Sequence, residues 1–334
     1  MITPNLAPWQ PTQWQSELSS AFRRPEELLA FLDTQRPDVD AANQFSMLVP
    51  KSFAKRMRPG DPRDPLLLQV LPVQCEALHV DGFSDDPLGE ADEDLGFAVA
   101  PGLIRKYRSR ALMITTPGCA INCRYCFRRH FPYQEHRPKS HAQALAAIAA
   151  DAQITEVILS GGDPLLLNDR ALAELLREIC TIEHVKRIRL HSRIPVVLPS
   201  RVTEDLLDTL NQQTCDIVMV IHCNHAQELD AQTAQALALI HATGTVLLNQ
   251  SVLLQGINDD AAILCELSES LFDQGVMPYY LHMPDRVKGT SHFFVEDERA
   301  VGLHHQMQSQ LSGYLVPRLV REVAGASSKV IVRG

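Results

Sequence analysis

The sequence has no surplus of positive charge and no long apolar run. Its 334 residues carry a formal net charge of −9, with a pI near 5.8, whereas a protein that binds nucleic acid usually turns a basic surface to the phosphates. The one local basic strip consists of Arg124, Arg128, Arg129 and His130. No segment approaches the ~18 consecutive apolar residues that cross a bilayer, and the N-terminal MITPNLAPWQ lacks the features of a signal peptide. We therefore expect a cytoplasmic protein with no nucleic-acid and no membrane partner.

Short β-branched runs alternate with helical stretches from about residue 110 onwards. The runs are ALMITT, EVILS, VKRIRLHS, DIVMVIH, TVLLNQS and MPYYLHM, and they are followed by helical patterns near 140–151, 168–180, 203–213, 230–242, 259–273 and 296–311. Six such units predict a parallel sheet with right-handed crossovers. Both an open doubly wound sheet and a partial (β/α)6 barrel fit this rhythm.

Polar residues follow the ends of the expected strands one after another. They are Cys119, Gly161 to Asp163, Ser192 with Arg193, His222, Gln250 and Asp285. In a barrel the carboxyl ends of the strands meet at one mouth, where barrel enzymes keep their chemistry. We therefore favour an α/β fold built as a partial (β/α)6 barrel.

The expected domain organisation has three parts. Residues 1–100 form an accessory region, with helices from Trp14 to Phe22 and from Pro25 to Leu32 and an irregular, Pro-, Gly- and Asp-rich stretch over 59–102. Residues 101–313 form the barrel, and residues 314–334 form a short C-terminal tail.

Three of the eight cysteines stand together in TTPGCAINCRYCFRRH, as Cys119-x3-Cys123-x2-Cys126. Three thiolates on one loop can hold three irons of a [4Fe–4S] cluster and leave the fourth iron open. Structural zinc requires four ligands, and the nearest further candidates, His222, Cys223 and His225, lie about 100 residues later. A zinc site, or a non-catalytic iron–sulfur module, remains an alternative.

This cysteine spacing after a first strand resembles the radical S-adenosylmethionine superfamily. LSGGDP (159–164) follows the second strand and resembles the superfamily's "GGE" motif, which contacts the amino group of S-adenosylmethionine. The resemblance implies that S-adenosylmethionine is bound by Tyr125, Gly161, Gly162, Asp163 and Gln250.

Further strings resemble the lysine 2,3-aminomutase family from about residue 45 to the end. They include DPLGE (86–90), PGLIRKYRSRALMITTPGCAINCRYCFRRHF, SRIPVVLPSRV, IHCNH, LNQSVLLQGIND, PYYLHMPD and SGYLVPRLVRE. These enzymes use a [4Fe–4S] cluster, S-adenosylmethionine and pyridoxal 5'-phosphate to move the α-amino group of L-lysine to the β-carbon. The chain is most similar to the short bacterial branch that makes (R)-β-lysine for elongation factor P. This implies a functional link to elongation factor P and its lysyl ligase, and an electron donor such as flavodoxin or ferredoxin.

The family resemblance also implies roles for individual residues. Pyridoxal phosphate needs a lysine for attachment, and among only seven lysines Lys329 matches the family's position. Arg110, Tyr107 and His222 match positions around that cofactor. Arg128 offers a fork for the substrate carboxylate, and Asp285 and Glu322 match acids that hold the substrate ammonium.

The same chemistry on another amino acid is the nearest alternative function. Arginine remains open, because it also carries a distal cation. Glutamate is disfavoured, because Asp285 and Glu322 would repel its side chain.

Overall fold

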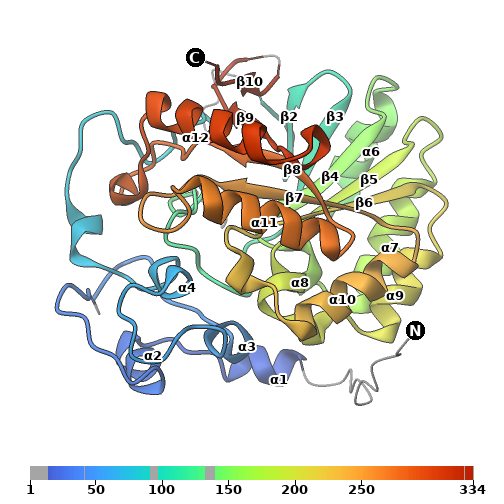
Figure 1. Ribbon diagram of the computed structural model, residues 1–334. Helices are drawn as coiled ribbons and strands as arrows, with labels where there is room; N and C mark the ends of the chain where they lie inside the picture. Colours follow the sequence, from blue (N-terminus) through green and yellow to red (C-terminus); the bar gives the residue numbers. More distant parts are fainter. Residues whose placement is uncertain (1–13, 41, 91–96, 132–139, 327, 334) are drawn as a thin grey trace.

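The computed structural model describes residues 14–40, 42–90, 97–131, 140–326 and 328–333. One ten-stranded sheet forms its centre (Figure 1). In chain order the strands are β1 (Ala98–Ala100), β2 (Leu103–Tyr107), β3 (Arg110–Thr116), β4 (Glu156–Gly161), β5 (Arg187–Ser192), β6 (Asp216–Ile221), β7 (Val246–Val252), β8 (Met277–His282), β9 (Arg318–Arg321) and β10 (Val330–Ile331).

The strand order is that of a barrel. Each strand from β3 to β9 runs parallel to its neighbour and lies beside the strand that precedes it in the chain. A doubly wound sheet instead reverses its strand order at a switch point. Among the described residues β1 and β10 do not pair with each other, so the barrel is open. The expected partial α/β barrel is confirmed.

The six expected helices follow strands β3 to β8. They are α6 (Ala142–Ala150), α7 (Asp169–Cys180), α9 (Glu204–Asn211), α10 (Ala231–Ala242), α11 (Ala261–Asp273) and α12 (Asp297–Gln310). Four of them begin at a side chain whose oxygen accepts a backbone N–H of the first turn, namely Asn168, Thr203, Asp230 and Asp260. No helix in the described ranges has the length and apolar character needed to cross a membrane.

Four short strands extend the expected sheet. β1 and β2 add to β3 as an antiparallel pair, and β9 and β10 continue the sheet beyond β8. β9 and β10 lie in the expected C-terminal tail, so the sheet crosses the proposed boundary at residue 313. Their sequences, RLVR and VI, are too short for a periodic pattern to mark them.

The N-terminal region packs closely against the barrel. Its helices are α1 (Trp14–Ser19), α2 (Pro25–Phe31), α3 (Lys51–Ala54) and α4 (Pro65–Leu68), followed by the 3-10 turn η1 (Gln74–Ala77). The barrel itself has one further short helix after β5, α8 (Ile194–Val197). Leu28, Phe53 and Leu66 are fully buried in the same apolar core as Leu159 of β4. Within the Pro-, Gly- and Asp-rich stretch, residues 64–73 are mostly buried, whereas residues 77–86 are mostly exposed.

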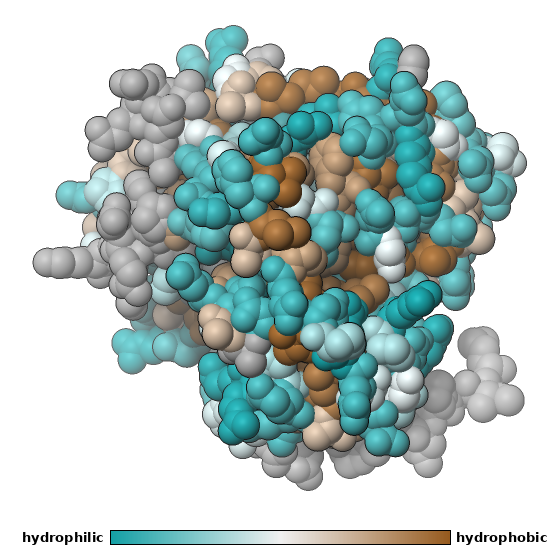
Figure 2. All heavy atoms as spheres, turned by 90° about the vertical axis from the view of Figure 1, so that its left-hand side faces the viewer, coloured by the Kyte–Doolittle hydropathy of each residue, from teal (hydrophilic) through white to brown (hydrophobic). Residues whose placement is uncertain are grey.

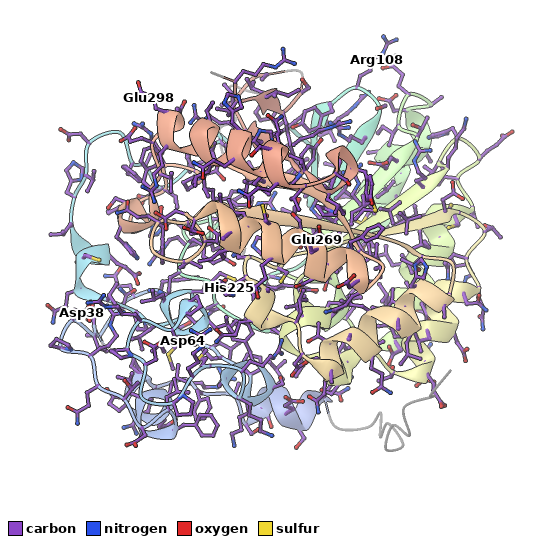
Figure 3. All side chains as sticks on the ribbon, in the orientation of Figure 1. Asp38, Asp64, Arg108, His225, Glu269 and Glu298 are labelled. Carbon is purple, nitrogen blue, oxygen red and sulfur yellow. The ribbon has the colours of Figure 1, made fainter. Side chains whose placement is uncertain are left out.

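Polar contacts also join this region to the barrel. Gln227 donates through Nε2 to Asp64 Oδ2 at 2.6 Å. Figure 3 shows Asp64 at the lower left, His225 nearer the centre and Arg108 at the upper right. On the face shown in Figure 2, polar side chains are interspersed with smaller apolar areas.

The two glycines after β4 allow two loops to approach each other closely. The N–H of Gly162 donates to Thr116 O and that of Asp163 donates to Gly118 O, both at 2.8 Å. A Cβ on Gly162 would lie 1.9 Å from Gly118 O, and Gly161 has a φ of +103°. The glycine pair therefore presses the turn after β4 against the loop that leads into Cys119.

Gly162→Ala is expected to destabilise the protein, because the added carbon must displace the Gly118 carbonyl. Overpacking of this kind costs about 1–3 kcal/mol or more, which corresponds to a fall of several degrees in the thermal midpoint followed by circular dichroism. Gly313→Ala is a matched control, since a Cβ there meets no atom within 4 Å. Equal midpoints for the two variants would contradict the role of this close approach.

Candidate active site

The carboxyl ends of the strands surround one cavity of about 280 Å³. Every candidate site residue except Gly161 lines it, although these residues come from segments more than 200 positions apart. The candidates that line it are Tyr107, Arg110, Cys119, Cys123, Tyr125, Cys126, Arg128, Gly162, Asp163, His222, Gln250, Asp285, Glu322 and Lys329.

The N-terminal region holds the cysteine loop in place. The N–H of Asn122 donates to Leu48 O at 3.0 Å, and that of Arg124 donates to Gln69 O at 2.8 Å. The guanidinium of Arg124 is fully buried, and its Nε donates to Glu76 at 2.9 Å. The basic strip expected from the sequence is therefore mostly an internal network rather than a charged surface.

The three cysteines of this loop are free thiols in partly buried positions. Burial, reinforced by Asp163 and the other two cysteines, raises the pKa of Cys119 well above its usual value. Burial and Cys123 raise the pKa of Cys126 to about 11. Such thiols ionise only beside a strong cation, so iron is a chemically suitable partner for this set.

The described residues contain no group of three His, Cys, Asp or Glu side chains that could share a single metal ion. A [4Fe–4S] cluster makes a different demand, because each cysteine binds a different iron. Three thiols on one loop, all of which line the cavity, suit that demand.

Asp163 joins the ends of β4 and β5. Its carboxylate accepts from Ser192 Oγ at 2.7 Å and from the backbone N–H groups of Leu165, Arg193 and Ile194 at 2.8–3.1 Å. Burial raises its pKa to about 6. These protein donors hold the carboxylate in place at the edge of the cavity, and the contact with S-adenosylmethionine that the sequence resemblance implied stays a prediction.

Tyr125 and His222 form a pair beside the cysteines. Their rings stack with centroids 5.7 Å apart, and Tyr125 Oη lies 3.1 Å from His222 Nε2. Asn224 also donates to Tyr125 Oη at 2.7 Å. Burial lowers the pKa of His222 well below its usual value, so the ring is neutral. His222 lines the same cavity as Lys329, and its contact with pyridoxal phosphate, implied by the family resemblance, stays a prediction.

Lys329 and Glu322 form an ion pair in the same cavity. Tyr107 Oη donates to Glu322 Oε1 at 2.8 Å, and the guanidinium of Arg110 lies 4.1 Å from the centre of the Tyr107 ring. Burial and the nearby Glu322 raise the pKa of Asp285 to about 7. The structure therefore brings Lys329 together with both acids and with two of its expected cofactor neighbours.

Arg128 pairs with Glu90, a residue for which no role was expected from the sequence. Its Nε and Nη2 donate to the two carboxylate oxygens of Glu90 at 2.7 and 3.0 Å, and Lys106 Nζ lies 3.0 Å from the same carboxylate. Burial alone would raise the pKa of Glu90, but Arg128 and Lys106 lower it to about 2. Glu90 ends the DPLGE string that carried part of the resemblance, which was the one available signal for it.

A histidine with an unsatisfied ring nitrogen also faces this cavity. His191 on β5 lines it, and its buried Nε2 has no hydrogen-bond partner within the described structure. Burial and nearby cations, first Arg189, lower its pKa well below the usual value. An unsatisfied, neutral imidazole nitrogen of this kind suits a polar ligand in the cavity.

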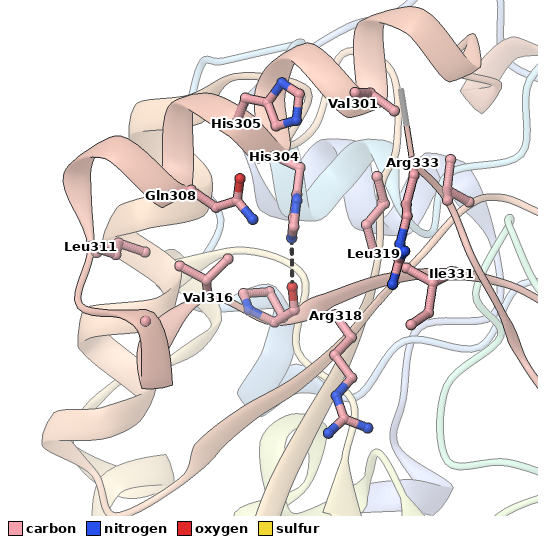
Figure 4. Close-up of a pocket in the computed structure, with 13 residues that line it drawn as sticks. Val301, His304, His305, Gln308, Leu311, Val316, Arg318, Leu319, Ile331 and Arg333 are labelled. Carbon is pink, nitrogen blue, oxygen red and sulfur yellow. Dashed lines mark hydrogen bonds between the residues drawn. The ribbon is translucent and has the colours of Figure 1, made fainter.

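A second hollow, of about 700 Å³, lies between α12 and strands β9 and β10 (Figure 4). His304 on α12 bonds there to Pro317 O at 2.9 Å. None of the candidate site residues lines this hollow. The chemistry is therefore assigned to the first cavity.

Comparison with known proteins agrees with this arrangement. The model of the Radical SAM superfamily matches residues 113–221. The chain is 46% identical to L-lysine 2,3-aminomutase from Escherichia coli K12 over 323 residues, which cover 95% of the chain and 93% of that protein. The Haemophilus influenzae protein of the same name is 44% identical, with 95% of each chain covered.

A more distant relative aligns over almost the whole chain. L-lysine 2,3-aminomutase from Clostridium subterminale is 31% identical over 333 residues, which cover 98% of this chain and 78% of that protein. Identity at this level, carried over nearly the full length, establishes the relationship: the chain belongs to the L-lysine 2,3-aminomutase family of radical S-adenosylmethionine enzymes.

Proposed function

We propose that the chain is an L-lysine 2,3-aminomutase, an isomerase that moves the α-amino group of L-lysine to the β-carbon. The observation that carries this proposal is the convergence of the three cysteines, Lys329 and the acids Asp285 and Glu322 on one cavity. The relatives named L-lysine 2,3-aminomutase, which match nearly the whole chain, support it.

Different walls of the cavity would hold the different cofactors. Cys119, Cys123 and Cys126 would bind a [4Fe–4S] cluster, and Lys329 would attach pyridoxal phosphate. The neighbouring groups assigned to S-adenosylmethionine are Tyr125, Gly161, Gly162, Asp163 and Gln250, and those assigned to pyridoxal phosphate are Tyr107, Arg110 and His222. When bound, the cluster and S-adenosylmethionine supply the radical that abstracts hydrogen, and pyridoxal phosphate carries the amino group. The protein contributes position and a dry cavity.

Charged side chains would fix the orientation of lysine. Arg128, two residues after Cys126, would bind the carboxylate, and Glu90 holds its guanidinium in one orientation through two hydrogen bonds. Asp285 and Glu322 would bind the ammonium. The Lys329–Glu322 pair supports this assignment, because it is an alkylammonium held by one of these same acids.

The finer parts of the proposal rest on the similarity to the short bacterial branch of the family. We infer that the product is (R)-β-lysine for the modification of elongation factor P by its lysyl ligase. Flavodoxin or ferredoxin would donate the electron, and the cytoplasm would be the site of action.

An anaerobic assay with reconstituted protein tests the activity directly. Protein, S-adenosylmethionine, pyridoxal phosphate and dithionite are incubated with lysine, arginine or glutamate, and α- and β-amino acids are separated after chiral derivatisation. We expect (R)-β-lysine from lysine. Formation of β-arginine without β-lysine would mean that the substrate is arginine rather than lysine. Formation of no β-amino acid from any of the three substrates would refute the aminomutase function.

Cys126→Ala is expected to abolish cluster assembly and turnover, because it removes one of three thiolates on the loop. Iron content and the charge-transfer absorbance near ~400 nm measure the loss. Cys265→Ala serves as the control, since Cys265 is buried beside α12 and outside the cavity. Normal iron content and normal cleavage of S-adenosylmethionine in the Cys126 variant would contradict the assignment.

Lys329→Ala is expected to lose covalently attached pyridoxal phosphate while it retains the iron–sulfur cluster. The two groups depend on different parts of the chain, so their losses should be separable. Borohydride reduction followed by peptide mass spectrometry locates the attachment. Lys106 also lines the cavity, so Lys106→Ala, which should retain the label, is the matched control. A label on Lys106 in the wild-type protein would contradict the prediction.

Asp285→Asn is expected to lower kcat/KM for lysine by tenfold to a few hundredfold. The change keeps the shape but removes a charge-assisted hydrogen bond worth about 1.5–3 kcal/mol. Cluster content and pyridoxal phosphate content should not change, and discrimination between lysine and an uncharged side-chain analogue should narrow. Asp297→Asn, at an exposed acid paired with Arg321, is the control. Unchanged discrimination in Asp285→Asn would mean that the ammonium is bound elsewhere, with Glu322 the first residue to examine.

A further inference from the structure

Arg193 places a buried positive charge against one of the cluster cysteines. It directly follows β5, and only 7% of its surface is exposed. Its Nη1 donates to Cys123 Sγ at 2.7 Å. Neither the substrate assignment nor the cofactor assignments above use this residue.

The guanidinium of Arg193 is fixed on several sides. Its Nη2 donates to Gln69 Oε1 at 2.7 Å and to Glu228 Oε2 at 2.9 Å, and its backbone N–H donates to Asp163 at 2.8 Å. Glu228 is completely buried. Gln69 and Glu228 come from different segments and both bind Nη2, which leaves Nη1 directed toward the sulfur, while the buried Nε has no partner within the described structure.

Two aromatic rings flank the buried guanidinium of Arg193 and lower the local dielectric around it. The guanidinium carbon lies 5.6 Å from the centre of the Tyr125 ring and 5.4 Å from that of Phe53. A hydrogen bond from a charged donor is stronger in such a low-dielectric site than in water. The contact with Cys123 is therefore built to act electrostatically on whatever the sulfur binds.

We propose that Arg193 raises the reduction potential of the iron–sulfur cluster, an inference that rests on the proposed role of Cys123 as a cluster ligand. Reduction adds one electron from an external donor and makes the cluster more negative by one charge. Hydrogen bonds to the sulfurs and local charge set the potential of such clusters. A cationic donor stabilises the reduced state more than the oxidised state, so electron delivery becomes easier.

Redox titration of the reconstituted holoenzyme, followed by electron paramagnetic resonance without S-adenosylmethionine, tests this role. For Arg193→Gln we expect the equilibrium constant for reduction to fall at least tenfold, which is a shift of about 59 mV to more negative potential for a one-electron couple. Arg193→Lys keeps the charge but loses the fixed geometry, so its potential should lie in between. Arg189→Gln is the matched control, because Arg189 is a cavity arginine that pairs with Glu156; its shift should be smaller.

The outcomes of the titration separate tuning from structural support. Arg193→Gln protein with full iron content and the wild-type potential would overturn the proposal, as would a shift no larger than that of Arg189→Gln. If both Arg193 variants lose iron, the contact is tested in reduced wild-type enzyme labelled with 15N-arginine by electron–nuclear double resonance. A 15N coupling to the cluster supports the contact, and the absence of a coupling overturns the proposal. Normal iron content in Cys123→Ala would instead refute the ligand assignment on which the inference rests.

Discussion

The buried ion pair between Glu76 and Arg124 determines where the cysteine loop lies. Arg124 sits inside the loop, two residues before Cys126, and Arg129 adds a second cation to the same carboxylate at 2.6 Å. Burial alone would raise the pKa of Glu76, but the two arginines lower it. Removing one partner of a buried pair typically costs about 3–5 kcal/mol. The N-terminal region that supplies Glu76 therefore helps to form the cofactor site, although none of the three cysteines of the loop belongs to it.

The charged side chains named above form two groups in the cavity, one with an excess of cations and one with an excess of carboxylates. Glu90 accepts from Arg128 and Lys106, so this group carries one carboxylate and two cations. The second group contains Asp285, Glu322 and Lys329. The extra cation of the first group can pair with a carboxylate at one end of a ligand. The extra carboxylate of the second group can pair with an ammonium at the other end. Buried charges of this kind are costly unless they are paired, so the arrangement favours a zwitterionic amino acid with a cationic side chain.

Much of the fold and of the site could be predicted from the sequence, because buried parallel strands and a cysteine motif leave strong local patterns. Most of the strands β3 to β8 are rich in apolar residues, although β5 (RIRLHS) alternates, and the cysteine spacing limits the chemistry. The partners of the site residues could not be predicted. Glu90 and Arg128 are 38 positions apart, and Asp163 meets Arg193 only through the pairing of β4 with β5. Such contacts depend on tertiary packing, which no local pattern encodes. For the same reason the stacking of His222 on Tyr125 could not be predicted, and the place of His222 beside pyridoxal phosphate stays a prediction.

The position of Lys329 links the proposed attachment of pyridoxal phosphate to the proposed binding of the substrate ammonium. Its ammonium pairs with Glu322, and Tyr107 donates to the other oxygen of that carboxylate. A lysine attached to pyridoxal phosphate no longer offers a free ammonium, so the acids then have one cation fewer. Burial and Glu322 raise the pKa of Asp285 to about 7 even with Lys329 nearby. The ammonium of a bound lysine would lower it, because an opposite charge at short range favours the ionised carboxylate. With the roles proposed for Lys329, Asp285 and Glu322, cofactor attachment and substrate recognition would be coupled through the same two carboxylates.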